Sequence, residues 1–578
     1  MTADSTDNRE ARPSASRPSG VRHHVVLVCV VMSALLYLDR VCVSIAEGYI
    51  RDDLGLGDRE MAWFLGVFFW TYALGQVPSG WLSERFGPRA MLAAYILGWS
   101  ACTLALGWVG GFVSLIVMRA GLGIAQAGAY PSSGLILRRW IPFGDRGRAS
   151  SLVAFGGRVG GAVAPLLTMW MILWFTPLST PTDFGAGDIL DPAGIAARIV
   201  VEPDPSKRAE VRRQAIVERI ADGFPPVLLE RCREEAKSIS ADDLTARLND
   251  LLARKDFFDP AWMETVEFER EVRGLAEAGN ALDEASRRRL NRLAIEAAFP
   301  RKVRKLYGAG WRPTMFVYGA VGLGVAALFW IVVRDTPQAH PAVNTAELNV
   351  IAPAEGGATP VESAAAVSAG APPAFPWRTI LSSSSLWAMS MAQFGTNVGW
   401  ALLVTNLPRY LDERFQVPLA DRATMQFVPL LVGIAGMLAG GVLTDRLVPI
   451  LGLRWGRASL IALARFMSVL AYLSCPWLDS AWGVVIALSV VAFSVDLGVG
   501  ATWAYAQDVG GRFAASVLGW GNMWGNLGAA LAPVLFNRVL ELSGGNWDHV
   551  FHMCAAAFAI SGFAALGIDA TKPIDKGE

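Results

Sequence analysis

The sequence predicts an all-α polytopic membrane protein, with twelve transmembrane helices in two pseudo-symmetric halves of six and a helical insertion between spans 5 and 6. Three observations predict this class. Hydrophobic residues make up 53% of the 578 residues, twelve apolar runs are each long enough to cross a bilayer, and one loop pattern occurs twice. A mean hydropathy of +0.37 is too high for an ordinary soluble enzyme, so the chain is expected to fold in lipid.

The apolar runs qualify as spans by length, because a hydrocarbon core of roughly 30 Å needs roughly 20 helical residues at 1.5 Å each. They begin near His24, Met61, Arg89, Phe112, Ala149, Arg312, Thr379, Arg422, Arg457, Ala481, Phe513 and Trp547. A linker rich in Pro and Ala separates the first six from the last six. The expected division is 1–22 (tail), 23–178 (spans 1–5), 179–311 (insertion), 312–334 (span 6), 335–376 (linker), 377–570 (spans 7–12) and 571–578 (tail).

A repeated loop pattern relates the two halves. Gly-Trp-Leu-Ser-Glu-Arg-Phe-Gly at 80–87 follows the second run, and Gly-Val-Leu-Thr-Asp-Arg at 441–446 follows the eighth. Two six-helix halves related by a parallel repeat are typical of one class of secondary transporter. Glycines permit close helix approach, and the charged side chains can pair and hold the halves together. The expected cytoplasmic gate consists of Gly80, Glu84, Arg85, Gly87, Asp445 and Arg446.

Positive charges in the short loops predict the orientation, because Lys and Arg favour the cytoplasmic side of a cell (inner) membrane. Arginines gather in the loops after the second, fourth and eighth runs, so both termini are expected in the cytoplasm and the insertion outside it. In the insertion, Leu244, Leu248, Leu251 and Leu252 fall on one helical stripe, which predicts a small helical subdomain. This subdomain is either a cap over the transport path or a solvated insertion without a transport role.

Several function classes are excluded by what the sequence lacks. It contains no GxxxxGK[ST] phosphate loop, no HExxH motif and no GxSxG with plausible partners. The six cysteines show no CxxC metal spacing, and the five histidines fall in the tail, in the linker or at membrane edges. We therefore expect no catalytic residue, no metal and no cofactor. A formal net charge of +0 implies no nucleic-acid partner.

Further motifs connect the chain to a known family. They are Tyr-Leu-Asp-Arg-Val at 37–41, Arg-Ala-Gly-Leu-Gly at 119–123, Gly-Trp-Arg-Pro at 310–313 and Arg-Asp-Thr-Pro-Gln-Ala-His-Pro at 334–341. Together with the repeated loop, they resemble the major facilitator superfamily and, within it, the anion:cation symporter branch. The resemblance covers nearly the whole chain except the insertion. It implies carriage of sugar acids, organic acids or phosphate-like anions.

Four ionisable residues of the first half lie at membrane depth, where each costs at least roughly 2.5 to 3.5 kcal/mol unless it lines a cavity. They are Asp39, Arg40, Arg119 and Arg158. The donor fork of Arg matches a carboxylate or phosphate, so the three arginines favour an anionic substrate. The resemblance implies that Arg40 contacts the anion and that Arg119 serves coupling. The alternatives are ion pairs for Arg40 and Arg158 and outward snorkelling for Arg119.

Residue Gln126 bears on ion coupling. Relatives in the branch that the chain resembles often carry Glu there, whereas Gln cannot carry a proton. Asp39 and Asp496 remain as candidates for coupling to H+ or Na+. The adjacent Arg40 favours the ionised form of Asp39, so Asp496 is preferred, with a role as partner of Arg465 as its alternative.

Polar and aromatic side chains on helical faces complete the expected pocket, because lipid would penalise each of them. They are Tyr37, Tyr72, Gln76, Gln126, Gln393, Asn397, Asn522 and Asn526. The sequence thus predicts a monomeric secondary transporter that carries a small organic anion, a carboxylate or sugar acid, by cation-coupled symport in the lipid bilayer. A membrane sensor on a transporter fold and an exporter of another small molecule are the open alternatives.

Overall fold

The computed structural model describes residues 17–574, except residues 178, 204–207, 267, 269, 279–281, 353–374 and 418. The predicted tail at 1–16, most of the predicted linker and residues 575–578 lie outside this part. Within it the structure is helical, and its β contact is one isolated bridge between Ile189 and Val303. Eight helical stretches are long and apolar enough to cross a membrane. The prediction of an all-α fold is confirmed.

The helices form two halves. The first half contains α1 (Val21–Ile45), α2 (Glu47–Leu54), α3 (Asp58–Phe86), α4 (Pro88–Leu106), α5 (Phe112–Ala127), α6 (Ala129–Trp140), α7 (Arg146–Trp174) and α16 (Trp311–Val332). The second half contains α19 (Trp377–Ser382), α20 (Ser384–Ala401), α21 (Leu407–Phe415), α22 (Leu419–Ser474), α23 (Ala481–Leu497), α24 (Val499–Gly510), α25 (Ala514–Leu542) and α26 (Trp547–Leu566). The short α17 (Thr345–Ile351) follows α16.

Glycines mark the places where helical passes join. Within α22, two helices meet at Gly452, whose φ of 75° lies in the left-handed region that glycine adopts without steric cost. Gly128 links α5 to α6 and Gly498 links α23 to α24, both with right-handed helical backbone angles. Each of these two pairs therefore continues in nearly one direction.

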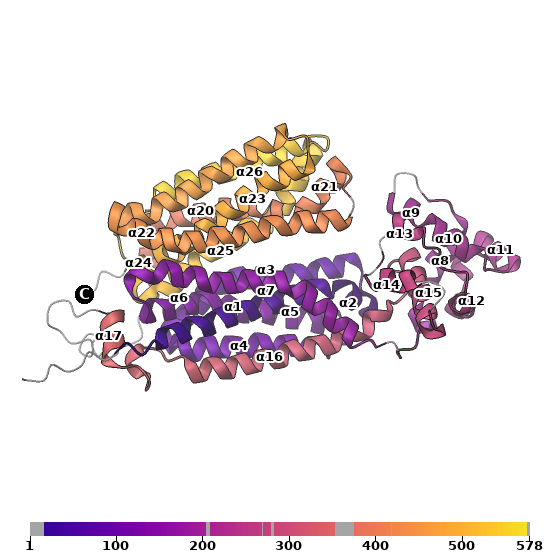
Figure 1. Cartoon of the computed structure of the whole chain (residues 1–578), viewed down its shortest axis with the longest axis horizontal. Helices are drawn as coiled ribbons and strands as arrows, with labels where there is room; N and C mark the ends of the chain where they lie inside the picture. The colour runs from indigo at the N-terminus through magenta and orange to yellow at the C-terminus, as the bar shows by residue number, and fades with distance from the viewer. Residues whose placement is uncertain are drawn as a thin grey trace, which may run out of the picture.

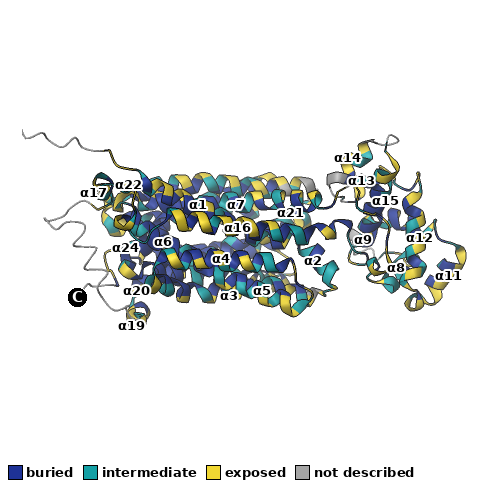
Figure 2. Cartoon of the chain, turned by 90° about the horizontal axis from the view of Figure 1, so that it is seen from below, coloured by how far each residue is buried: buried dark blue, intermediate teal, exposed yellow. Residues whose placement is uncertain are grey.

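The two halves lie side by side and are not parallel (Figure 1). Their helices converge at the end that carries α17 and diverge toward the opposite end. Large apolar side chains are exposed along the outer surfaces of both halves, among them Leu27, Leu166, Leu470 and Phe563, and exposed positions follow the helices lengthwise (Figure 2). Such a surface is unfavourable in water and matches the hydrocarbon core of a bilayer.

A helical module lies beyond the end of the bundle opposite α17 (Figure 1). It contains α8 (Pro192–Val200), α9 (Arg208–Arg212), α10 (Gln214–Ala221), α11 (Pro226–Glu234), α12 (Ala241–Ala253), α13 (Trp262–Thr265), α14 (Arg270–Ala278) and α15 (Glu284–Ala298). We call it the α8–α15 module. Leu244, Leu248, Leu251 and Leu252, the leucines of the predicted stripe, are buried in its own hydrophobic core. The module is therefore a folded unit with an interior separate from that of the bundle.

The α8–α15 module is anchored on the first half. Leu290 and Leu293 of α15 share a hydrophobic cluster with Tyr49 and Ile50 of α2 and with other residues of the first half. The buried Glu296 accepts hydrogen bonds from Arg292 and from the backbone N–H of Leu306, both at 2.8 Å, which ties α15 to the segment before α16. Burial raises the pKa of the Glu296 carboxyl, and Arg292 opposes that shift.

Candidate functional site

A cavity of about 200 Å³ lies between the two halves. Its walls come from α1, α3, α6 and α7 of the first half and from α20, α22, α23, α24 and α25 of the second half. Among the described residues, the charged side chains in these walls are Arg40, Arg158, Arg465 and Asp496. The cavity is thus shared by both halves and is rich in guanidinium groups.

Arg40 of α1 is held by neutral groups. Its Nε and Nη2 donate to Oε1 of Gln126 at 3.4 and 3.5 Å, and Gln126 donates to the backbone oxygen of Leu36 at 3.2 Å. The guanidinium also lies 5.0 Å from the ring centre of Phe68 and 4.4 Å from that of Tyr72. Aromatic faces attract a cation without neutralising its charge. Gln126 therefore does not line the cavity itself but positions Arg40, which does.

An ion pair between the halves crosses the cavity. Arg158 of α7 donates from Nη2 to Oδ1 of Asp496 in α23 at 2.5 Å, and its guanidinium lies 4.5 Å from the ring centre of Trp400. The second carboxylate oxygen of Asp496 is buried and has no hydrogen-bond partner. A side chain at Gly433 would meet that oxygen at 2.6 Å, so glycine allows α22 to approach it. The sequence gave a pair with Arg465 as the alternative role of Asp496 and an ion pair as the alternative role of Arg158, and the structure pairs Asp496 with Arg158.

Arg465 of α22 is the third guanidinium in the walls. Its side chain is 2% exposed, and Nη1 donates to the backbone oxygen of Val495 at a long 3.4 Å. Its buried Nε has no hydrogen-bond partner. The negative charge of Asp496 acts on the Arg465 guanidinium, but Arg465 and Asp496 form no ion pair in the described part of the chain. The signal in the sequence was its position inside an apolar run, the same signal that selected Arg158.

Asp39 and Arg119 lie inside the first half and do not line the cavity. Both are buried, at 0% and 1% exposure. The carboxylate of Asp39 lies beside the indole of Trp99, and the Arg119 guanidinium lies 4.6 Å from the ring centre of Phe68. The same ring lies 5.0 Å from the Arg40 guanidinium, so Phe68 contacts both arginines.

The other pocket residues that the sequence predicts are divided between cavity and interior. Those that line the cavity are Tyr37, Tyr72, Gln393, Asn397, Asn522 and Asn526. Gln76 is buried and its backbone lies against Gly519. The wall residues that the sequence did not single out are Tyr130, Ala154, Thr396, Trp400, Met437, Val495, Val499, Thr502, Trp503 and Gly525. Small, hydroxyl and aromatic residues of this kind are equally typical of helix packing, so the sequence carried no signal for them.

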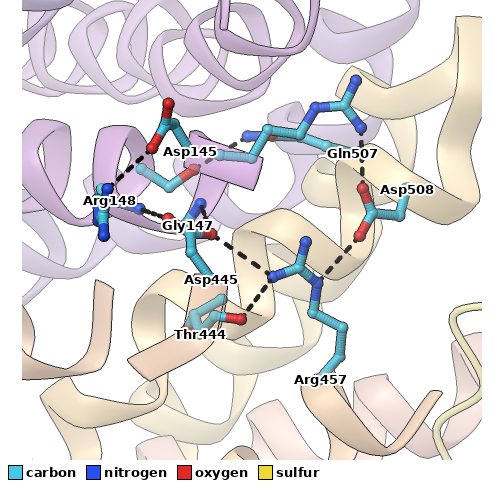
Figure 3. Close-up of polar contacts among 10 residues, drawn as sticks. Asp145, Gly147, Arg148, Thr444, Asp445, Arg457, Gln507 and Asp508 are labelled. Carbon is cyan, nitrogen blue, oxygen red and sulfur yellow. Dashed lines mark hydrogen bonds and ion pairs between the residues drawn. The ribbon is translucent and has the colours of Figure 1, made fainter. Parts of the chain in front are cut away.

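Two carboxylates join the halves at the α17 end. Glu84, near the end of α3, accepts from the backbone N–H and the hydroxyl of Ser516 at 2.7 and 2.6 Å, in the first turn of α25. Asp445 of α22 accepts from the backbone N–H groups of Gly147 and Arg148, both at 2.9 Å, in the first turn of α7 (Figure 3). At the first turn of a helix, an anion is stabilised by N–H groups that have no partner within the helix and by the helix dipole. We call these contacts the Glu84 latch and the Asp445 latch.

Further charged residues surround the Asp445 latch. Arg457, 1% exposed, lies 3.9 Å from Asp445 through Nη1 and donates from Nε to Asp508 at 3.0 Å (Figure 3). Asp508 also accepts from Arg146 of the first half at 2.9 Å. Gln507 donates to the hydroxyl of Ser150 across the same boundary. The Asp445 latch is therefore part of a network of alternating charges.

The remaining residues of the predicted gate behave differently from one another. A Cβ at Gly80 would lie 2.8 Å from the backbone of Ala515, so the close contact of α3 with α25 requires glycine there. Gly87 has a φ of 88° and lies against Asp335. Arg85 and Arg446 are exposed and form no ion pair in the described part of the chain.

Comparison with known sequences identifies the family. Residues 29–213 and 306–533 match the Major Facilitator Superfamily. The chain belongs to this superfamily. The unmatched interval between the two stretches covers most of the α8–α15 module. The superfamily consists of transporters and not of enzymes, which confirms the prediction that this chain is not an enzyme.

Individual relatives are organic-anion transporters by name. The chain is 24% identical over 557 residues to the probable sulfoacetate transporter SauU of Cupriavidus necator, over 96% of this chain and 95% of that protein. It is 21% identical over 568 residues to the probable galactarate/D-glucarate transporter GudP of Bacillus subtilis, over 96% and 93% of the two chains.

Solved structures agree in fold. The proton:xylose symporter XylE superposes with a TM-score of 0.54 at 12% identity, over 95% of this chain and 94% of that one. The transporter FucP in its outward conformation superposes with a TM-score of 0.53 at 11% identity, over 94% and 98%. At this level of identity, the similarity concerns the fold alone.

Proposed function

We propose that the chain is a secondary active transporter that carries a small organic anion by alternating access. One observation carries the proposal: a cavity between the two halves presents three guanidiniums and one carboxylate. A guanidinium offers paired N–H donors that match carboxylates and sulfonates, so the cavity suits an anion. The relatives named for sulfoacetate and for galactarate and glucarate support a carboxylate, sulfonate or sugar acid as the substrate.

The proposed topology follows the positive-inside rule. It has twelve spans, both termini in the cytoplasm and the α8–α15 module outside the cytoplasm, in the inner membrane of a cell. The two latches then form a closed cytoplasmic gate, and the halves diverge toward the outside (Figure 1). Alternating access requires both latches to break while the other end closes.

The proposed coupling is symport with a cation, and Asp496 is its carrier. A coupled cycle needs a group whose ionic state differs between the two facing states, and Gln126 cannot supply one. Asp496 lies in the cavity, and its pair with Arg158 must open when the halves separate at this level. Loss of that pair is the step at which Asp496 can take up H+ or Na+.

Uptake by the purified protein in proteoliposomes tests the function. Labelled sulfoacetate and glucarate should accumulate under an imposed pH or sodium gradient, and Asp496→Asn should abolish this accumulation while counterflow exchange continues. Accumulation driven by voltage alone, at roughly 2.3 kcal/mol per charge per 100 mV, would contradict cation coupling. Binding without any flux would instead favour the sensor hypothesis.

Arg40→Lys tests the anion contact itself. The ammonium group of Lys has no bidentate fork, so binding of the anion should be lost almost as completely as in Arg40→Ala. Arg454→Gln is the matched control, because Arg454 is exposed near the turn at Gly452 and outside the cavity. Unfolding temperatures of all three variants should stay near that of the wild type. Normal binding by Arg40→Lys would exclude a bidentate contact at this residue.

A further inference from the structure

The charges in the cavity are not balanced. Asp496 is the acidic residue in the described walls, and its short contact with Arg158 satisfies one guanidinium. Arg40 and Arg465 have no acidic partner within ion-pair distance in the described part of the chain. A buried charge without a counter-ion is costly, and a cavity that keeps two of them is suited to a ligand that supplies the missing charges.

The two unbalanced guanidiniums belong to different halves. Arg40 is on α1 of the first half, and Arg465 is on α22 of the second half. Each is fixed by neutral groups, Arg40 by the Gln126 amide and aromatic rings, and Arg465 by the Val495 carbonyl. The charge of Asp496 acts on Arg465, but neither Arg40 nor Arg465 forms an ion pair in the described part of the chain. A ligand with one anionic group can pair with only one of them.

The cavity walls also carry uncharged polar side chains. Among them are the side chains of Tyr37, Gln393, Thr396, Asn397, Asn522 and Asn526. The side-chain amide of Asn397 donates to the Gln393 backbone at 2.9 Å and that of Asn526 to the Asn522 backbone at 2.7 Å, which fixes the orientation of both amides. Fixed amides and hydroxyl groups can bind the hydroxyls of a substrate or tolerate a plain carbon chain.

We propose that the substrate is a short dianion whose two anionic groups bind Arg40 in one half and Arg465 in the other. This inference rests on the proposed function and deepens it by naming the charge class. The ligand then bridges the halves, next to the Arg158–Asp496 pair that also bridges them. A monoanion of the same length occupies one arginine and leaves the other without a counter-ion.

The experiment compares ligands that differ by one charge. Binding of dicarboxylates with three to six carbons, and of glucarate, is measured on the full-length protein against the matched monocarboxylates and gluconate. The variants are Arg465→Gln, Arg465→Lys, Arg40→Gln and the control Arg454→Gln. Unfolding temperatures report whether each variant folds, and Arg465→Lys keeps the charge if Arg465→Gln does not fold.

The wild type and Arg454→Gln should bind the best dianion at least about tenfold more tightly than its monoanion, because each added charged contact contributes on this scale. Arg465→Gln should reduce dianion affinity to that of the monoanion and leave monoanion affinity within about twofold, and Arg465→Lys should keep part of the preference. Equal affinity of the wild type for both classes would overturn this inference and leave the proposed function intact. An equal loss of dianion affinity and monoanion affinity in Arg465→Gln would also overturn this inference and leave the proposed function intact. Binding of no anion by a folded wild type would overturn both.

Discussion

The Glu84 latch and the Asp445 latch perform the same task with different electrostatic support. Glu84 lies near the end of α3 and accepts from the first turn of α25, and Asp445 lies within α22 and accepts from the first turn of α7. Each set of hydrogen bonds joins the two halves. Asp445 also lies near Arg457. Arg457 in turn pairs with Asp508, and Asp508 pairs with Arg146 of the first half. Glu84 accepts from Ser516, and the positive charge of Arg139 also acts on it, but it has no ion-pair partner among the described residues. The repeat thus conserves geometry while the charges around it differ.

This difference separates two contributions to the stability of the contact between the halves: anion binding at a helix N-terminus and buried ion pairs. A helix N-terminus stabilises an anion by typically 0.3 to 1 kcal/mol, and by about 2 kcal/mol in favourable partly buried positions. Loss of one member of a buried ion pair costs more, about 3 to 5 kcal/mol, since the other charge is left without compensation. Arg457 lies on α22 with Asp445, so the ion pair that crosses the boundary beside this latch is the one between Arg146 and Asp508. With this pair beside it, we expect the Asp445 latch to dominate the closed state.

The largest effect is expected for Asp445→Asn. The amide keeps the size of the side chain but removes the charge that faces α7. It can also accept from only one of the two N–H groups of Gly147 and Arg148, so the closed α17 end should lose about 3 kcal/mol. This corresponds to roughly a hundredfold larger open fraction. Alkylation of a cysteine at Ser151, which is buried against Gly441 of the other half, measures that fraction. The protein without the introduced cysteine is the control, and an unchanged rate would contradict the prediction.

A smaller effect is expected for Glu84→Gln. Gln can still accept from the Ser516 backbone, so the change mainly removes the interaction of a charge with the α25 dipole, about 1 kcal/mol. Alkylation of the same cysteine should become about fivefold faster. If Glu84→Gln and Asp445→Asn accelerate alkylation equally, neither the second N–H group at Asp445 nor the charges near it add to the contact, and the two latches are equivalent.

The smallest effect is expected for Arg85→Gln and Arg446→Gln. Both side chains are exposed and form no ion pair in the described residues, and exposed charges contribute about 0 to 1 kcal/mol even when paired. Alkylation should stay within about twofold of the wild-type rate. A large acceleration in either variant would show that the arginine of the loop pattern, and not its acid alone, holds the halves together.

The sequence predicted the fold because long apolar runs and a repeated loop depend only on local composition. Several of the side chains that it selected by their expected depth line the cavity, among them Arg40, Arg158 and Asp496. Which way a side chain faces depends on helix rotation, about 100° per residue, which the sequence does not determine. Asp39 and Arg40 are neighbours in the chain, and consequently one lies inside the first half and the other in the cavity.

Contacts between distant segments were the part that the sequence could not supply. Asp496 was predicted to be functional, but its partner Arg158 is 338 positions away and on the other half. The acids of the loop pattern were expected to hold the halves through charge pairs with arginines. In the structure both acids bind backbone N–H groups at helix starts, and such groups have no residue-specific signal.

Leu290 and Leu293 of the α8–α15 module pack in a hydrophobic cluster with residues of the first half. In a rocking cycle it would consequently travel as a rigid extension of that half, projecting into water beyond the lipid. Such a projection makes a small rotation of the half visible as a larger displacement at its tip. A fluorophore on α11 of the module and another on α21 of the second half would therefore report opening and closing as a change in energy transfer. An antibody fragment bound to the module would also give the bundle in its detergent micelle a recognisable orientation in electron images.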